Sequence, residues 1–550
     1  MAAAPPPGAT APARRREVFS SRNLFILAAI GSAVGLGNIW RFPYIAYDNG
    51  GGAFIIPYLV ALLATGVPLL FFDYVVGHRY RGSAPLSFAR IQKWMESIGW
   101  WQVLVCVIIG IYYAVIVGWA LMYTIFSVTK AWEQNADGAS GFLFGDFLAL
   151  SDDVGVSFDF VPGVLWPHLI IWLVVAVIIV AGVRRGIARA NLVFLPLLLV
   201  MFLALVVQSL FLPGATDGLN ALFTPDWSAL GRLEVWAAAV GQIFFSLSIG
   251  FGIMITYASY LKRRSDLTGS GMVVAFSNSG FEILAGIGVF AALGFMAQAA
   301  GSGIEDVAGA GIGLAFVAFP TLISEAPLGA VIGVLFFGSL FFAGLTSLIS
   351  IIEVIVAAVR DKLHLTRVQA SLAVVIPMAL VSTLLFPTTT GLYVLDVLDE
   401  FVNKFGILAA ALVSVIAVAW IGRRLGILSN HLTRASSIPA SGAWKVFIAG
   451  VVPVVLTAIL ISEIVRHLQT PYEDYPQWFL NAFGWGMAIG LVVVGALLAL
   501  IPWPKAVRTR IAEDEISAEM QAVYDRSHHG DEERDIAESS ATDRAEGVDR

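Results

Sequence analysis

Long apolar runs separated by short polar segments make up most of the chain. A helix of about 20 apolar residues is long enough to cross the hydrocarbon core of a bilayer. The runs lack the strict alternation of apolar and polar positions that is typical of a transmembrane β-barrel. We therefore expect an all-α polytopic membrane protein with twelve transmembrane helices, at about residues 24–48, 53–76, 99–129, 165–183, 191–212, 234–260, 270–298, 328–359, 369–386, 391–420, 444–465 and 479–503.

The first run contains an unusual polar pattern. Its stretch AAIGSAVGLGNIWRFP (28–43) has three glycines within seven positions, followed by Asn38, Arg41 and a proline. One interpretation is a GxxxG face that packs against another helix, but packing requires neither Asn38 nor Arg41. Unpaired backbone at this depth must face a protein-lined cavity, so a helix that breaks here predicts a binding site.

The sixth run contains a second interruption. Its stretch VGQIFFSLSIGFGIMITYASY (240–260) has two serines and two glycines between positions 246 and 252. Runs one and six are each the first of a block of five runs. Because five is an odd number of crossings, the second block must cross the membrane in the opposite sense to the first, which places both breaks near the midplane. We expect a 5+5 inverted repeat with these boundaries: a cytosolic N-terminal segment at 1–22, a transport core at 23–424 with repeats at about 23–212 and 234–424, helices eleven and twelve at 425–503, and an acidic cytosolic tail at 504–550.

Composition excludes an ordinary soluble globular protein, because 58% of the residues are hydrophobic and only 13% are charged. The net charge of −6 equals that of the tail from residue 504, which has seven Lys/Arg against thirteen Asp/Glu. Such a tail is expected to be solvated and partly disordered, and no nucleic acid partner is expected. The lone cysteine, Cys106, lies in an apolar run, which excludes a disulfide framework.

Basic residues gather in alternate loops. The positive-inside rule assigns loops rich in Lys and Arg to the cytosol. The opposite loops, such as 131–164, nearly lack these residues. We therefore expect both termini on the cytosolic side of the plasma (inner) membrane, together with Arg14, Arg15, Arg16 and Arg22, His78, Arg79 and Arg81, Arg184, Arg185 and Arg189, Lys262, Arg263 and Arg264, Arg360 and Lys362, Arg423 and Arg424, and Lys505 and Arg508.

Three stretches carry a specific resemblance to a known family. They are GSAVGLGNIWRFPYIAYDNGGGAFIIPY (31–58), GQIFFSLSIGFG (241–252) and FFAGLTSLISI (341–351). From about Arg16 to Asp399 the chain resembles the neurotransmitter:sodium symporter family, nearest its bacterial amino-acid transporter branch with the LeuT-like fold. The resemblance implies a sodium-coupled symporter, not an enzyme, that imports a neutral, hydrophobic L-amino acid by alternating access. It leaves a homodimer open.

The resemblance also implies a substrate site. Half-helix ends attract charges of both signs, so two broken helices suit an amino-acid zwitterion. Relatives that carry amines without a carboxylate commonly have an aspartate in place of Gly35, which favours a carboxylated substrate here. Tyr113 could otherwise be an ordinary core aromatic. The implied substrate-binding residues are Ala33, Leu36, Gly37, Ile109, Tyr113, Phe245, Ser246, Ser248, Phe251, Ser347 and Ile351.

Two sodium sites follow from the same resemblance. Sodium prefers hard oxygen ligands, which neutral carbonyls and hydroxyls supply. Outside this motif, Thr346 and Ser347 would be expected to bond back to their own helix. The implied ligands are Ala33, Asn38, Ser246 and Asn278 for the first site, with the substrate carboxylate, and Gly31, Val34, Ala343, Thr346 and Ser347 for the second.

Residues near both ends of the core match the gates of this family. Arg41 would pair with Asp399 as an outer gate, although Asp399 could also be a solvated acid at a helix end. The ion pair of the inner gate would join Arg16 to Asp361. The implied inner gate as a whole consists of Arg16, Phe19, Tyr260 and Asp361.

Glu282 is an acidic residue deep in run seven, one helical turn after Asn278. A carboxylate within the membrane is costly and by default indicates a function. Chloride-dependent relatives typically have a serine at the matching position. The resemblance therefore implies that Glu282 replaces chloride, which makes transport chloride-independent and leaves proton antiport open. The alternative is a protonated acid that only satisfies a neighbouring hydroxyl.

Two other classes of function compete with symport. An amino-acid-gated or ion-conducting channel is the main alternative, because glycines and polar residues also line pores. The bipolar site and the paired gates favour a transporter, since they suit occlusion of a solute. A membrane-embedded enzyme is disfavoured, because the apolar runs contain no HExxH motif, no Ser/His pair and no paired aspartates.

Overall fold

The computed structural model describes residues 17–304, 311–440, 442–504 and 507. Arg16 and nearly all of the acidic tail lie outside these ranges. Within them the chain is helical and contains no β-strand, only two isolated bridges. The expected all-α class is therefore confirmed.

Within the described ranges, ten helical spans are long and apolar enough to cross a membrane. Short π-helical turns interrupt several of them, so that one span can hold two α-helices. The principal helices of the ten spans are α4 (Ile55–Ala61) with α5 (Val67–Tyr80), α7 (Glu96–Thr129), α9 (Pro162–Val180), α10 (Ala188–Leu210), α14 (Leu267–Ala300), α18 (Gly329–Leu363), α19 (Arg367–Leu385), α20 (Gly391–Phe401) with α21 (Leu408–Ile416), α23 (Gly442–Val446) with α24 (Val452–Gln469), and α25 (Gln477–Phe479) with α26 (Gly486–Leu500).

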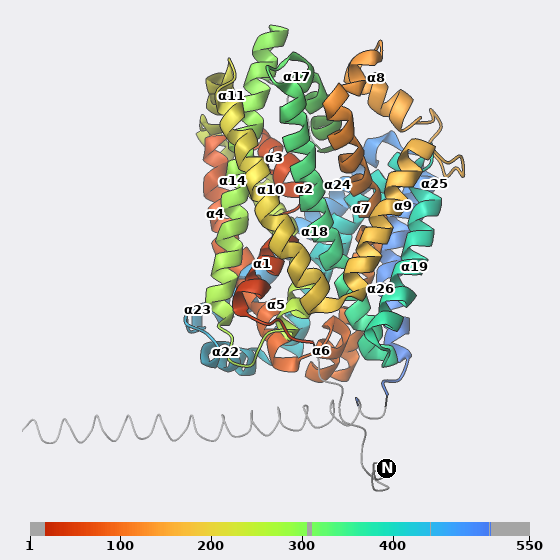
Figure 1. The fold of residues 1–550 in the computed structure, drawn as a ribbon. Coiled ribbons are helices and arrows are strands. Elements are labelled where there is room, and N and C mark those ends of the chain that lie inside the picture. The colour runs from red at the N-terminus through yellow and green to blue at the C-terminus, as the bar shows by residue number, and fades with distance from the viewer. Residues whose placement is uncertain (1–16, 305–310, 441, 505–506, 508–550) are drawn as a thin grey trace, which may run out of the picture.

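Shorter helices lie at the two ends of the bundle (Figure 1). Those at the lower end are α6 (Ala84–Ile91) and α22 (Leu425–Arg434). Those at the upper end are α8 (Gly138–Gly141), α11 (Ala215–Phe223) and α17 (Phe319–Glu325).

The first expected segment is a bent pair rather than a single helix. α1 (Arg22–Ala33) is followed by α2 (Leu36–Trp40) and α3 (Phe42–Asp48), and the two halves meet at 56°. The N–H of Gly35, at the break, donates to Oδ1 of Asn38 at 2.8 Å. Asn38 therefore satisfies backbone that the break exposes. In Figure 1, α1 lies below α2 and α3, so the break lies well inside the bundle.

The sixth expected segment consists of two short helices. α12 (Leu233–Ser246) and α13 (Ile253–Ser259) are joined by the non-helical residues 247–252. Gly250 and Gly252 in this link have φ angles of 88° and 82°. Left-handed backbone of this kind costs glycine little, which explains both glycines.

Neighbouring helices satisfy the backbone of this link. The N–H of Gly250 donates to Asp73 of α5 at 3.4 Å. The carbonyl of Phe251 accepts a bond from the thiol of Cys106 of α7 at 3.1 Å. α12 and α13 are each too short to count as a span, so the expected twelve crossings and the inverted repeat stay predictions.

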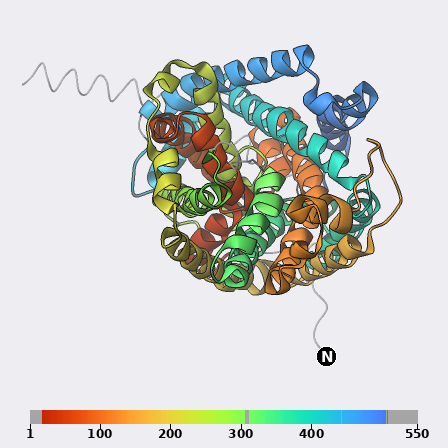
Figure 2. The same cartoon turned by 90° about the horizontal axis from the view of Figure 1, so that it is seen from above.

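The most buried spans form the centre of the bundle. In the apolar stretches of the spans that contain α18 and α7, 89% and 83% of the residues are buried. In the last span, which contains α26, only 17% are buried. Figure 2, seen from above, shows the blue C-terminal helices at the edge of the molecule. α1, α2 and α13 all contact α18. The central helices therefore form the scaffold against which the two interrupted segments pack.

Candidate functional site

The two interrupted segments lie next to each other. The carbonyl of Ser32, in the last turn of α1, accepts hydrogen bonds from the hydroxyls of Ser248 (3.1 Å) and Ser347 (3.3 Å). Ser248 belongs to the link after α12 and Ser347 to α18, so one carbonyl joins three elements. Ser32 was not among the predicted site residues, because it contributes its backbone carbonyl rather than its side chain.

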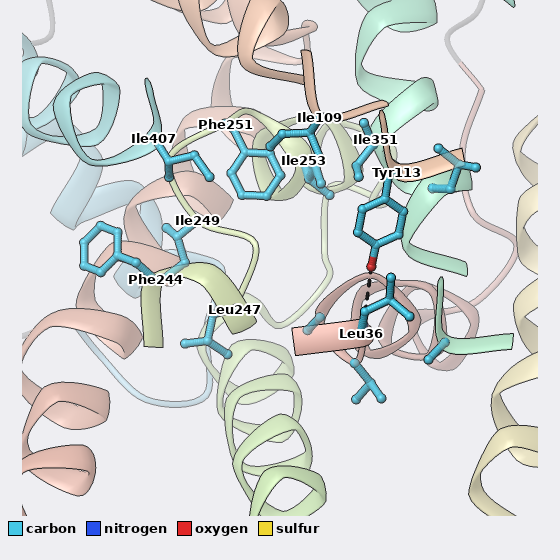
Figure 3. Packing of buried hydrophobic residues seen from close by; sticks show 14 of the residues in the cluster. Leu36, Ile109, Tyr113, Phe244, Leu247, Ile249, Phe251, Ile253, Ile351 and Ile407 are labelled. Atoms are coloured by element: carbon cyan, nitrogen blue, oxygen red, sulfur yellow. Dashed lines mark hydrogen bonds between the residues drawn. The ribbon is translucent and has the colours of Figure 1, made fainter. Parts of the chain in front are cut away.

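Tyr113 of α7 reaches the start of α2. Its hydroxyl accepts a hydrogen bond from the N–H of Leu36 at 3.4 Å, drawn as a dashed line in Figure 3. A Cβ placed on Gly35 would lie 3.2 Å from this hydroxyl and 2.8 Å from Oγ of Ser347. Gly35 therefore faces Tyr113 and Ser347, and the hydroxyl of Tyr113 contacts the backbone at the start of α2.

Apolar side chains lie on the same side of α2 as Tyr113. Figure 3 shows Ile109, Phe251 and Ile351 on the same side of Leu36 as the Tyr113 ring. Each of the three is at most 5% exposed. These three predicted wall residues are therefore buried on the Tyr113 side of α2.

Phe245 of α12 fills the space beside α2. A Cβ placed on Gly37 would lie 2.2 Å from the Phe245 ring. The guanidinium of Arg41 lies 5.0 Å from the centre of the same ring. A glycine at position 37 is therefore needed for the close approach of α2 and α12.

A chain of polar side chains joins α2, α14 and α12. Nδ2 of Asn38 donates to Oδ1 of Asn278 at 2.9 Å, and Nδ2 of Asn278 donates to Oγ of Ser246 at 3.0 Å. These side chains belong to residues that are at most 2% exposed. Three residues expected at the first sodium site thus lie together. The fourth, Ala33, ends α1 and is followed by Val34, which is expected at the second site.

The residues expected at the second sodium site lie where α1 faces α18. A Cβ placed on Gly31 would lie 3.6 Å from Cβ of Thr346. Oγ1 of Thr346 lies 3.0 Å from the carbonyls of Phe342 and Ala343, as expected of a hydroxyl that bonds back to its own helix. Ser347 instead bonds across to α1.

The expected outer gate is not closed by an ion pair in this conformation. Among the ion pairs of the described residues, none joins Arg41 to Asp399. Oδ1 of Asp399 accepts hydrogen bonds from the hydroxyl of Tyr112 (2.6 Å) and from Nδ2 of Asn403 (2.9 Å). The expected pair of Arg41 with Asp399, and its role as an outer gate, stay predictions.

Part of the expected inner gate lies outside the described residues. Arg16 is not described, so its pairing with Asp361 stays a prediction. The N–H of Phe19 donates to the carbonyl of Tyr260 at 3.0 Å, and the two rings lie 6.2 Å apart. Asp361 accepts a bond from the N–H of Ser83 at 2.9 Å. The N-terminal segment thus packs on the end of α13.

An ion pair that was not predicted from the sequence lies beside this gate. Oε1 of Glu17 lies 2.8 Å from Nη1 of Arg360 on α18. Glu17 also accepts a bond from the N–H of Val183 at 2.8 Å, and Nε of Arg184 donates to the carbonyl of Val18 at 2.7 Å. The N-terminal segment is therefore bound to α18 and to the loop between α9 and α10.

Glu282 of α14 is fully buried. Its carboxylate accepts hydrogen bonds from the hydroxyl of Tyr58 and from Nε2 of Gln242, the latter at 2.5 Å. Asn278, one turn earlier on α14, belongs to the polar chain described above. Glu282 therefore lies beside the first candidate sodium site. Sequence analysis did not name Tyr58 or Gln242, and their polarity within apolar runs was the available signal.

Known proteins resemble this chain over most of its length. A model of the Sodium:neurotransmitter symporter family matches residues 16–140 and 131–506. The chain is 42% identical over 468 residues to an uncharacterized sodium-dependent transporter of Methanocaldococcus jannaschii, which covers 84% of this chain and 93% of the relative.

Two animal transporters are also similar. A sodium-dependent dopamine transporter of Bos taurus is 30% identical over 548 residues, 92% of this chain and 78% of the relative. A sodium- and chloride-dependent neutral and basic amino acid transporter B(0+) of Mus musculus is 28% identical over an alignment 592 positions long. The alignment covers 96% of this chain and 92% of the relative. The chain therefore belongs to the sodium:neurotransmitter symporter family and is a multi-pass membrane transporter that uses sodium.

Proposed function

We propose that this transporter imports a neutral, hydrophobic L-amino acid together with sodium by alternating access. The observation that carries the proposal is the position of Asn38. Its Oδ1 holds the N–H of Gly35, which faces Tyr113, and its Nδ2 holds Asn278 in the first candidate sodium site. One side chain thus contacts both the substrate region and the ion region, which supports direct coupling of the two ligands.

The substrate carboxylate would bind at the backbone of Leu36 and Gly37, next to the hydroxyl of Tyr113. Its ammonium would bind carbonyls at the ends of α1 and α12, where the broken helices leave acceptors. The apolar side chains around Tyr113 would receive an uncharged side chain. The mouse relative is named for neutral and basic amino acids, which supports an amino-acid substrate.

Sodium would bind at two places near the break that follows α1. The first uses Ala33, Asn38, Ser246 and Asn278 with the substrate carboxylate, and the second lies between α1 and α18 beside Thr346. Neutral oxygens suit a monovalent ion, because a carboxylate cage would favour calcium.

We also propose that both termini and the basic loops face the cytosol at the plasma membrane. Hydrogen bonds gather these loops at one end of the bundle, since Arg184 donates to the carbonyl of Val18 and Arg81 to that of Leu261. The positive-inside rule then assigns this end to the cytosol.

Asn38→Ala is expected to weaken sodium and substrate binding together, and Asn278→Ala likewise. Loss of a buried hydrogen-bonding group costs about 1–3 kcal/mol, which corresponds to roughly a 5- to 150-fold loss of affinity. Linked binding must be reciprocal, so both ligands should lose affinity in each variant. Equilibrium binding of radiolabelled leucine across a sodium titration measures this.

The matched control for this prediction is Asn49→Ala, which removes an amide that donates to the carbonyl of Ile45 at 2.9 Å, away from both sites. It should bind like wild type. Proteoliposome uptake separates a symporter from a channel, because only a symporter saturates and accumulates solute uphill under a sodium gradient. Equal leucine affinity with and without sodium would refute the coupling.

Loss of the Glu17 to Arg360 ion pair is expected to open the cytosolic side more often. A partly exposed pair contributes about 0.5–1 kcal/mol, so Glu17→Gln should raise cytosolic access roughly two- to fivefold. Thr256 of α13 is fully buried, so a cysteine introduced by Thr256→Cys would report access from the cytosolic side. The native Cys106 is also buried and should contribute little labelling of its own. Labelling by an impermeant maleimide from the cytosolic side measures the change.

The double variant with Glu17→Arg and Arg360→Glu, in which the two charges are exchanged, is the control for this ion pair. It should recover part of the protection, since the swap restores the ion pair but not the acceptor for Val183. Unchanged labelling in both Glu17→Gln and Arg360→Gln would show that the pair does not hold the cytosolic side closed.

A further inference from the structure

Asn191 of α10 carries a buried oxygen that the proposed function does not use. The residue is 0% exposed, and its Nδ2 donates to the carbonyl of Ile187 at 2.9 Å. Among the described residues, none donates a hydrogen bond to its Oδ1. The bond to Ile187 fixes the amide orientation, because the opposite orientation would set two acceptors against each other. A buried acceptor without a donor is costly, and a bound water or ion is one way to satisfy it.

The Oδ1 of Asn191 points at the part of α1 that faces the second candidate sodium site. A Cβ placed on Gly31 would lie 2.1 Å from this oxygen and 3.6 Å from Cβ of Thr346. Asn191 and Thr346 therefore flank the same position on α1 from two different helices. Helix α10 contacts both α1 and α18, so three helices meet at this point.

The chemistry of the oxygen suits a monovalent cation. An amide carbonyl is a hard, uncharged ligand of the kind that sodium accepts. A contact with the Cα–H of Gly31 would satisfy Oδ1 only weakly. Asn191 lies in the first turn of α10, after the π-helical turn Val183–Ile187 that begins the same span.

We propose that Oδ1 of Asn191 is an additional ligand of the second sodium site, contributed by α10 either directly or through one water. This inference rests on the proposed function, because it adds a third helix to a site otherwise built from α1 and α18. The cation would then bind α10 while it is bound to α1, and sodium occupancy would hold the two helices together.

The test uses two substitutions of similar size with opposite chemistry. Asn191→Leu removes the oxygen, so the sodium concentration for half-maximal thermal stabilisation of the purified protein, without amino acid, should rise about tenfold. Asn191→Asp keeps an oxygen and adds negative charge, so this concentration should fall. A purely packing role would move both variants in the same direction.

Ser209→Ala is the matched control on the same helix. Ser209 is 1% exposed, and its hydroxyl also has no partner among the described residues. It lies 18 positions further along α10, away from both candidate sodium sites, so its sodium response should equal that of wild type.

A wild-type sodium response in Asn191→Leu would overturn the inference while leaving the proposed function intact. If Asn191→Leu does not fold, the test rests on Asn191→Asp alone. A half-maximal sodium concentration in Asn191→Asp equal to that of wild type would then overturn the inference. If sodium does not stabilise the wild-type protein at all, the proposed function fails, and this inference fails with it.

Discussion

Gly35→Asp is expected to abolish amino-acid binding. The new side chain would start 3.2 Å from the hydroxyl of Tyr113 and 2.8 Å from Oγ of Ser347, in the region proposed to bind the substrate carboxylate. Two like charges about 4 Å apart repel by about 4 kcal/mol at an effective dielectric constant near 20, which corresponds to about a thousandfold loss of affinity. Binding of radiolabelled leucine at saturating sodium measures this loss.

Gly35→Asn is the matched control, because it has the shape of aspartate without the charge. Gly35 has an extended backbone with φ of −132°, so neither substitution strains the main chain. The hydroxyl of Ser347 can rotate away from a new Cβ. We expect Gly35→Asn to lose far less affinity than Gly35→Asp. Equal losses in the two variants would assign the effect to crowding, and normal binding in Gly35→Asp would remove Gly35 from the site.

Helical class could be predicted from the sequence because it depends on bilayer physics. The length of an apolar run is set by membrane thickness, and glycines within a run mark backbone that a continuous helix would not need. Run length alone does not determine the number of crossings, because residues 234–260 form two short helices joined by an irregular link. Length therefore fixes which segments enter the membrane, whereas the local conformation decides how each one crosses.

Side chains that are polar inside apolar runs could also be predicted as site residues. Asn38 and Asn278 are of this kind, and the structure bonds one to the other. Ser32 contributes its carbonyl to the site, and a carbonyl has no signature in the sequence. Asn191 is polar within a run as well, but its role depends on the approach of α10 to Gly31, which only the packed structure reveals.

Ion pairs were the least predictable part, because they depend on conformation as well as on sequence. Arg41 and Asp399 each have other contacts in this structure, and an alternating-access protein makes and breaks such pairs during its cycle. Glu17 and Arg360 are adjacent in sequence to the expected inner pair and have the opposite order of charge. Sequence alone locates charges near a gate, but it does not decide which of them meet.

Glu282→Ser is expected to make transport depend on chloride. The wild-type carboxylate accepts bonds from Tyr58 and Gln242 and lies beside Asn278 of the first candidate sodium site. In the proposed role it would supply the negative charge that balances the bound cation. Serine would remove this charge and leave the donors of Tyr58 and Gln242 facing an emptied space, which is a suitable environment for a small anion.

The expected effect is large because a buried charge would lose its partner. Removal of one member of a buried pair costs about 3–5 kcal/mol, so uptake by Glu282→Ser in gluconate should fall by roughly a hundredfold or more, and chloride should restore most of it. Wild-type uptake should be the same in chloride and gluconate. Glu282→Gln is the control, since glutamine fills the space without a charge and should not be rescued by chloride.

Sodium-driven uptake into proteoliposomes, with chloride replaced by gluconate on both sides, decides the role of Glu282. A large loss of wild-type uptake in gluconate would show that the carboxylate does not replace chloride, and a Glu282→Ser variant indifferent to chloride would show the same. Because Glu282 can take up a proton where chloride would leave, the return step would export a proton, and a pH-sensitive dye in the same vesicles should report it. Absence of this proton flux in a chloride-independent wild type would reject antiport and retain the fixed negative charge.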